Sequence, residues 1–144
     1  MTRGRTILLV EDNPHDVELT MVAFEKSGVA NEIVVARDGK EALDYLWGRG
    51  LHAGEDQRLP EVILLDLNLP KIGGLSVLKQ IRSHERTRRL PVVVLTSSTE
   101  DSDLIRSYDL GANSFVRKPV DFVQFTAAAR QLGLYWLVLN ESAK

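Results

Sequence analysis

The chain has 144 residues, 44% of them hydrophobic and 26% charged, which is the composition of an ordinary globular domain. Its net charge of -2 argues against a basic nucleic-acid-binding surface over the whole chain, and the lack of cysteine excludes disulfides, thiolate metal sites and cysteine nucleophiles. The start of the chain lacks the long apolar run of a signal peptide, and no segment reaches transmembrane length. We expect a cytoplasmic protein of one domain.

Five short apolar segments have the length and composition of buried β-strands. They cover residues 6–10, 32–36, 61–65, 91–95 and 113–117. The segments between them carry helix signals, so strands and helices alternate along the chain. Strands that are apolar on both sides, separated by helices, predict a parallel sheet covered on both faces. The fold class is therefore α/β, a doubly wound three-layer sandwich.

The first helix is the best defined by local sequence. Asn13 is suited to cap it, Pro14 suits its first position, and Gly28 ends it. Its predicted apolar face, at steps of four and three residues, consists of Val17, Met21 and Phe24.

Four more helices are predicted. The second follows an Asp38-Gly39 turn and ends near Trp47, and residues 48–59 then form a long polar connection. The third follows a turn at residues 70–74 and runs toward Glu85, the fourth runs from about residue 99 to Gly111, and the fifth begins near residue 121. Their apolar faces are marked by Ala42, Leu43 and Leu46, by Leu75, Leu78 and Ile81, and by Leu104 and Tyr108.

Polar residues whose side chains could bind a ligand or take part in a reaction follow four of the strands. Doubly wound folds bind ligands beyond the carboxyl ends of their strands, so these side chains are expected to meet there. They are Glu11, Asp12, Asp66, Thr96 and Lys118.

The three acids in this set require a positive partner. If the first and third strands are neighbours, their axes lie about 4.8 Å apart, and Glu11, Asp12 and Asp66 repel one another. A hard divalent cation such as Mg²⁺ fits, because it takes oxygen ligands. The alternative interpretation is that Asp12 belongs to the cap of the first helix and Glu11 points to solvent.

Two further residues extend this chemistry. Lys118 precedes a proline, which holds it in an extended turn at the strand edge, and Thr96 offers a hydroxyl donor or, alternatively, a helix cap. A carboxylate, a metal, a cation and a hydroxyl together suit phosphoryl transfer to Asp66.

Over nearly its whole length the chain resembles the receiver domain of bacterial two-component response regulators. The resemblance rests on the acid pair Glu11-Asp12, Asp66 within Leu-Leu-Asp-Leu-Asn-Leu-Pro, Gly74, Thr96-Ser97 and Lys118-Pro119. It implies a flavodoxin-like receiver fold with a five-stranded parallel sheet of order 2-1-3-4-5.

The resemblance also implies roles for individual residues. Asp66 would be the phosphoacceptor, and Mg²⁺, or Mn²⁺, would be held by Glu11, Asp12, Asp66 and the Asn68 main-chain carbonyl. Thr96 and Lys118 would contact the phosphoryl group, and the Lys118-Pro119 peptide would be cis. The aromatic switch position falls on Phe115, for which an ordinary core role is the alternative. The phosphodonor histidine would belong to a partner kinase.

The end of the chain suggests further contacts. We expect a single receiver domain over 1–144 with no output domain, ending in a long helix at about 121–140. Residues 134–139 are apolar on every side, which favours a homodimer through the last helix and the neighbouring strand, although this end could fold back onto the monomer. The tail and the 48–59 loop also resemble the stand-alone regulators of bacterial phytochrome-type histidine kinases. No nucleic-acid or membrane partner is expected.

Two other functions fit part of this residue pattern. An aspartate-nucleophile phosphatase often carries a general acid two residues after the nucleophile, whereas here that residue is Asn68. A binding module that is not phosphorylated would not need the intact acids, Thr96 and Lys118. A regulator with only self-phosphorylation and slow autodephosphorylation is the favoured reading.

Overall fold

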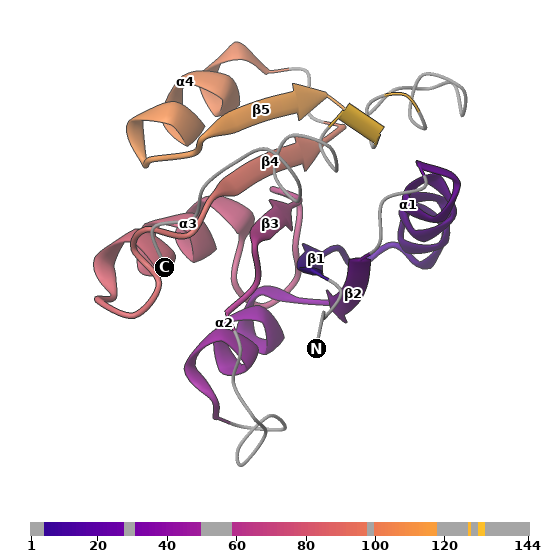
Figure 1. Cartoon of the computed structure of the whole chain (residues 1–144). Coiled ribbons are helices and arrows are strands. Elements are labelled where there is room, and N and C mark those ends of the chain that lie inside the picture. The colour runs from indigo at the N-terminus through magenta and orange to yellow at the C-terminus, as the bar shows by residue number, and fades with distance from the viewer. Residues whose placement is uncertain are drawn as a thin grey trace.

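Five parallel strands form a single sheet in the order β2-β1-β3-β4-β5 (Figure 1). The computed structural model describes residues 5–27, 31–49, 59–97 and 100–117, together with residues 127, 130 and 131. The strands are β1 (Arg5–Val10), β2 (Asn31–Ala36), β3 (Val62–Leu65), β4 (Val92–Thr96) and β5 (Ser114–Arg117). The predicted strand order is confirmed.

Four helices connect these strands within the described residues. They are α1 (Pro14–Ser27), α2 (Gly39–Trp47), α3 (Gly74–Ser83) and α4 (Asp101–Asp109). Figure 1 shows α1 on one side of the sheet and α2, α3 and α4 on the other. The three-layer sandwich is therefore confirmed by these elements.

Side chains that alternate along the strands fill two separate core layers. Ile63 and Leu65 pack with α2 and α3, whereas Val62 and Leu64 pack with α1 residues such as Phe24. All four β3 side chains are buried, as expected for the central strand of a covered parallel sheet.

Helix α1 begins as predicted and buries Val17 and Phe24 of its predicted face, but not Met21. The Asn13 side-chain oxygen accepts from the main-chain N–H groups of His15 and Asp16, which confirms the cap. The inclusion of Met21 in the buried face is wrong, because Met21 is 42% exposed and Thr20 is 2% exposed. Thr20 tolerates burial because its hydroxyl donates to the Asp16 carbonyl, 2.8 Å away.

Two other boundaries differ from the sequence prediction. Asp38 caps α2 by accepting from the Glu41 N–H, and Gly39 is the first residue of that helix instead of part of a separate turn. Helix α3 ends at Ser83, two residues before Glu85, with His84 already extended.

Helix α4 presents its apolar residues differently from the prediction. Tyr108 is 48% exposed and Ile105 is 59% exposed, while Ser107 is the residue of α4 that is buried. Ser107 donates to the Asp103 carbonyl, so its hydroxyl is satisfied inside the helix. The predicted apolar side of this helix therefore faces solvent in part.

Several predictions lie outside the described residues. They are the position of Lys118, the cis Lys118-Pro119 peptide, the helix at about 121–140 and most of the 48–59 loop. The extent of the domain, 1–144, stays a prediction as well. None of the helices that the structure describes is long and apolar enough to span a membrane.

Candidate phosphoacceptor and metal site

Three carboxylates meet at the carboxyl edge of the sheet, at the ends of β1 and β3. Val10 lies beside Leu65 in the parallel register, so the residues that follow each strand are also neighbours. Carboxylate oxygens of Glu11, Asp12 and Asp66 all lie within 4.8 Å of one another. The structure therefore brings together the three acids that the sequence predicted.

The acids differ in exposure. Glu11 is 2% exposed and Asp66 is 6% exposed, whereas Asp12 is exposed. The Glu11 carboxylate accepts from the Asn13 main-chain N–H at 3.2 Å. The alternative in which Glu11 points to solvent is thus wrong, and the cluster opens to solvent on the side of Asp12.

Asp66 is oriented by two neutral donors. Its Oδ1 accepts from the Thr96 hydroxyl at 2.9 Å and from the Asn68 main-chain N–H at 3.1 Å. Thr96 is completely buried at the end of β4, the strand directly beside β3, after which Asp66 follows. Because the hydroxyl is directed at Asp66, Thr96 does not act as the cap of α4, which begins at Asp101 with no side-chain cap.

The loop after Asp66 folds back tightly on the strand end. The Leu67 carbonyl accepts from the main-chain N–H groups of both Leu69 and Gly74. A Cβ placed on Gly74 would lie 2.3 Å from the Asp66 carbonyl oxygen and 2.5 Å from the Leu67 Cα. Glycine at this position therefore lets α3 begin directly behind the phosphoacceptor candidate.

The donor set fits a hard divalent cation. Bringing three carboxylates together costs electrostatic free energy, which a cation offsets, and oxygen is the ligand atom that Mg²⁺ and Mn²⁺ prefer. Asp12 keeps the cluster open to water, as an ion that retains part of its hydration shell requires.

Phe115 lies two strand positions before Arg117 on β5. It is half-buried against the core layer formed with α2 and α3, and Val94 is its neighbour on β4. Arg117 pairs in register with Thr96, and its guanidinium lies 5.5 Å from the Phe115 ring centroid. Alternation places Thr96, Phe115 and Arg117 on the same face of the sheet.

Sequence reasoning missed Arg117, which also contacts the start of α4 through an ion pair with Asp101 at 3.4 Å. Alternation along the strand could have placed Arg117 on the same face of the sheet as Phe115. No local signal in the sequence indicates its ion pair with Asp101 on α4. Lys118, the predicted cation of the site, is outside the described residues.

The strand order reverses beside β1, and the acidic cluster lies at the ends of β1 and β3. This is the switch point at which flavodoxin-like α/β domains bind their ligands. Residues 7–130 match the model of the response regulator receiver domain. The chain belongs to this family, whose members are signalling domains that work with sensor histidine kinases.

Two relatives match along most of their own length. The probable methanogenesis regulatory protein FilR2 of Methanothrix harundinacea is 48% identical over 136 residues, which are 94% of this chain and 86% of that protein. The response regulator Rcp1 of Synechocystis is 36% identical over 133 residues, 92% of this chain and 89% of Rcp1.

Solved structures of receivers superpose closely on the chain. The phosphorylated cyanobacterial phytochrome response regulator RcpA has a TM-score of 0.90 at 38% identity, covering 99% of this chain and 100% of RcpA. Rcp1 in its Mn²⁺-bound form has a TM-score of 0.88 at 34% identity, covering 97% and 99%. The bacteriophytochrome response regulator AtBRR is 55% identical with a TM-score of 0.79, covering 97% and 100%.

Proposed function

We propose that Asp66 accepts a phosphoryl group from a sensor histidine kinase in a Mg²⁺-dependent reaction. The observation that carries the proposal is the position of the Asp66 carboxylate. It belongs to a cluster of three acids whose oxygens lie within 4.8 Å of one another, and it accepts a hydrogen bond from the buried Thr96 hydroxyl, 2.9 Å away. An acidic cluster that can hold a divalent cation, with a hydroxyl donor beside it, suits transfer of a phosphoryl group, because both can neutralise charge on the phosphoryl oxygens.

The step is a direct displacement at phosphorus. A carboxylate oxygen of Asp66 forms the new P–O bond, the P–N bond to the kinase histidine breaks, and the nitrogen keeps the electron pair. Glu11, Asp12, Asp66 and the Asn68 carbonyl would hold the cation, which neutralises charge on the phosphoryl oxygens. Thr96 would donate its hydroxyl to one of those oxygens, and Lys118 would supply an ammonium group.

Slow self-dephosphorylation, and not turnover on phosphoesters, follows from the residue two positions after Asp66. Asn68 is exposed and lies beside the phosphoacceptor, with its main-chain N–H on Asp66 Oδ1. An amide can neither protonate the leaving group of a phosphoester nor take a proton from the water that would attack the aspartyl phosphate, as a carboxyl group can. The aspartyl phosphate would therefore persist long enough to act as a signal.

The assignment of Asp66 is tested by Asp66→Asn. The amide keeps an oxygen for Thr96 and the Asn68 N–H, so the fold is expected to persist while the nucleophile is lost. Incubation of both proteins with acetyl phosphate and Mg²⁺, followed by intact-mass analysis, should show the phosphoryl adduct on the wild type alone. An acid-labile adduct on the variant would contradict the assignment.

We propose a phytochrome-type sensor histidine kinase as the phosphodonor, in the cytoplasm. Support comes from the phytochrome response regulator RcpA and the bacteriophytochrome response regulator AtBRR, which match this chain over their full length. Phosphotransfer from a panel of purified kinases, compared at short reaction times, tests the pairing. Faster transfer from kinases of another sensor class would contradict it.

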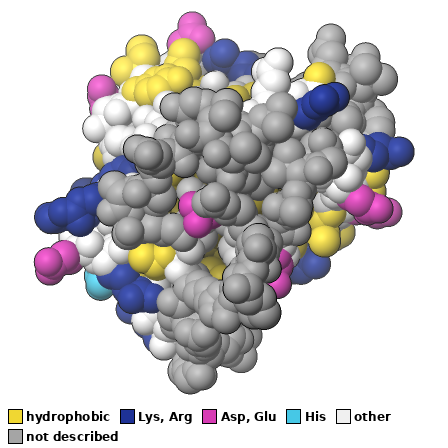
Figure 2. Space-filling view, viewed as in Figure 1, with side chains coloured by type: hydrophobic (Ala, Val, Ile, Leu, Met, Phe, Trp, Pro, Cys, Tyr) yellow, Lys and Arg dark blue, Asp and Glu magenta, His cyan; other side chains and the backbone are white. Residues whose placement is uncertain are grey.

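We further propose a homodimer through the last helix and the region of β5. Hydrophobic side chains are exposed over α4, beside β5, where Ile105 and Tyr108 are 59% and 48% exposed (Figure 2). Light scattering of the full chain and of a truncation after Gly133 tests the role of the tail. Equal masses for the two proteins would refute a tail-driven dimer.

A further inference from the structure

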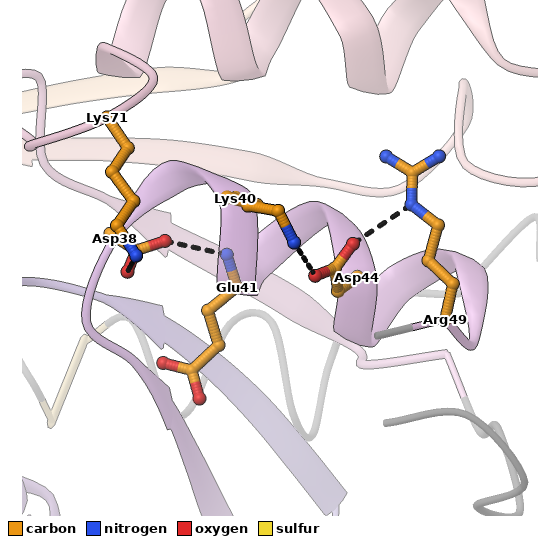
Figure 3. Close-up of polar contacts among 6 residues, drawn as sticks. All are labelled: Asp38, Lys40, Glu41, Asp44, Arg49 and Lys71. Atoms are coloured by element: carbon orange, nitrogen blue, oxygen red, sulfur yellow. Dashed lines mark hydrogen bonds and ion pairs between the residues drawn. The ribbon is translucent and has the colours of Figure 1, made fainter. Parts of the chain in front are cut away.

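The loop of residues 67–73, which joins Asp66 to α3, is anchored at its tip by the first turn of α2. The Lys71 ammonium lies 3.5 Å from Asp38 Oδ2, as Figure 3 shows. Beside this ion pair, a Cβ on Gly39 would lie 2.3 Å from the Ile72 carbonyl oxygen. We call the ion pair and this backbone contact the loop anchor, formed by Asp38, Gly39, Lys71 and Ile72.

Asp38 performs two tasks within the loop anchor. Its Oδ1 accepts from the Glu41 N–H at 2.7 Å and caps α2, while Oδ2 faces Lys71. The Asp38 side chain is 18% exposed and is therefore partly shielded from water, whereas the Lys71 side chain is 64% exposed. The cap holds the carboxylate in place before the lysine reaches it, which lowers the entropy cost of the pair.

The tip of the loop has a backbone conformation that needs support. Lys71 has a φ of +66°, the only positive φ of a non-glycine residue in the described part of the chain. The left-handed conformation is unfavourable for a residue with a Cβ, because the Cβ crowds the following carbonyl oxygen. Contacts on both sides of Lys71 hold it there: the ion pair to Asp38 and the close packing of Ile72 on Gly39.

The other end of this loop contacts the phosphoacceptor candidate. The Asn68 N–H donates to Asp66 Oδ1, and the loop is closed by the Gly74 N–H on the Leu67 carbonyl. Only five residues lie between Asn68 and Gly74, so a change at the tip is expected to alter the direction of the peptide groups near Asp66.

We propose that Asp38 and Lys71 are positioning residues for the metal site, because the loop anchor sets the direction of the Asn68 main-chain carbonyl. The inference rests on the proposed function, in which that carbonyl is a ligand of the cation. Asp38 and Lys71 are not themselves ligands in this proposal, because the acidic cluster consists of Glu11, Asp12 and Asp66.

Electrostatics and positioning predict opposite signs for a change at Lys71. The lysine carries the same charge as the cation, so its removal should strengthen Mg²⁺ binding if charge is its only contribution. If Lys71 positions the loop, its removal should weaken binding. The sign of the change therefore separates the two roles.

The experiment compares Lys71→Met with Lys71→Arg, which restores the ion pair, and with Lys40→Met. Lys40 is a matched control because it is 60% exposed and pairs with Asp44 on α2, away from the loop. Calorimetric Mg²⁺ titrations should show binding about two- to fivefold weaker in Lys71→Met, as expected for loss of an exposed pair. Lys71→Arg and Lys40→Met should match the wild type. Equal or tighter binding by Lys71→Met would overturn the proposal.

A second variant separates positioning from loss of the helix cap. Asp38→Ser keeps an N-cap oxygen for Glu41 but cannot pair with Lys71. We expect the metal-free melting temperature to stay close to that of the wild type, Mg²⁺ binding to weaken as in Lys71→Met, and the double variant to weaken no further. Additive losses would overturn a shared role. Absence of Mg²⁺ binding by the wild type would instead refute the proposed function.

Discussion

Asp66 and Asp44 are buried to the same extent but differ in the neighbours that the described residues give them. Each is 6% exposed. Asp44 lies on α2 between two cations, with Lys40 at 2.8 Å and Arg49 at 2.9 Å (Figure 3). Asp66 instead lies among further carboxylates and accepts from neutral donors at Oδ1. Burial alone therefore does not identify a functional acid; the clustering of further acids around Asp66 does.

The Asp44 cluster has the features of a structural element. The side-chain hydrogen bond from Lys40, and then that from Arg49, lowers the pKa of Asp44, although burial acts in the opposite direction. Arg49 also lies 4.4 Å from the Trp47 ring centroid, and that ring stacks on His84 at 4.8 Å. The cluster thus joins the end of α2 to the segment after α3.

The largest expected change in unfolding free energy tests whether the close packing of Gly74 on the Asp66 main chain holds Asp66 in position. Gly74→Ala places a methyl group against the Asp66 carbonyl and should cost about 3 kcal/mol of unfolding free energy. Gly73→Ala is the adjacent control, because a Cβ there meets nothing within 4 Å. Urea unfolding of both variants measures the difference. Similar costs for the two would show that the tight turn is not important.

The next effect tests the structural reading of Asp44. Asp44→Asn should lower the free energy of unfolding at pH 7 by about 1–2 kcal/mol, because two charge-assisted hydrogen bonds become weaker. A carboxyl whose pKa is lowered by folding stabilises above its unfolded pKa, near 3.8, and loses that contribution as the pH falls through its folded value. The difference between variant and wild type should shrink below about pH 4. A difference that does not change with pH would contradict this account.

The smallest effect on stability is expected in the acidic cluster of Glu11, Asp12 and Asp66. Here the substitution should stabilise the metal-free protein slightly, whereas the two substitutions above should destabilise it. Asp12→Asn removes one of three mutually repelling charges, so the metal-free protein should unfold at an equal or slightly higher temperature. Mg²⁺ affinity should nevertheless fall by about tenfold or more, since a charged ligand is lost. Thermal scans with and without Mg²⁺ measure both quantities. A clear loss of metal-free stability would place Asp12 with Asp44 as a structural acid.

Most of the site could be predicted because its residues follow strands. Apolar strands in a covered parallel sheet place the residues after them at one edge, which is where Glu11, Asp12, Asp66 and Thr96 lie. The loop anchor could not be predicted in the same way. The sequence placed Asp38 in a turn and not in the cap of α2, and its pairing with Lys71, 33 positions away, has no local signature.

The sequence by itself determined the strands, their alternation with helices, the Asn13 cap and the acids at the strand ends, because these depend on local periodicity and local hydrogen bonds. Tertiary packing decided where the buried faces of α1 and α4 depart from the apolar pattern. It exposed Met21 and Tyr108, and it buried Thr20 and Ser107, whose hydroxyls donate within their own helices. The two buried aspartates divide in the same way: Asp44 takes its cations from Lys40 and Arg49, four and five positions away, whereas packing of separate strands brings Glu11 and Thr96 to Asp66.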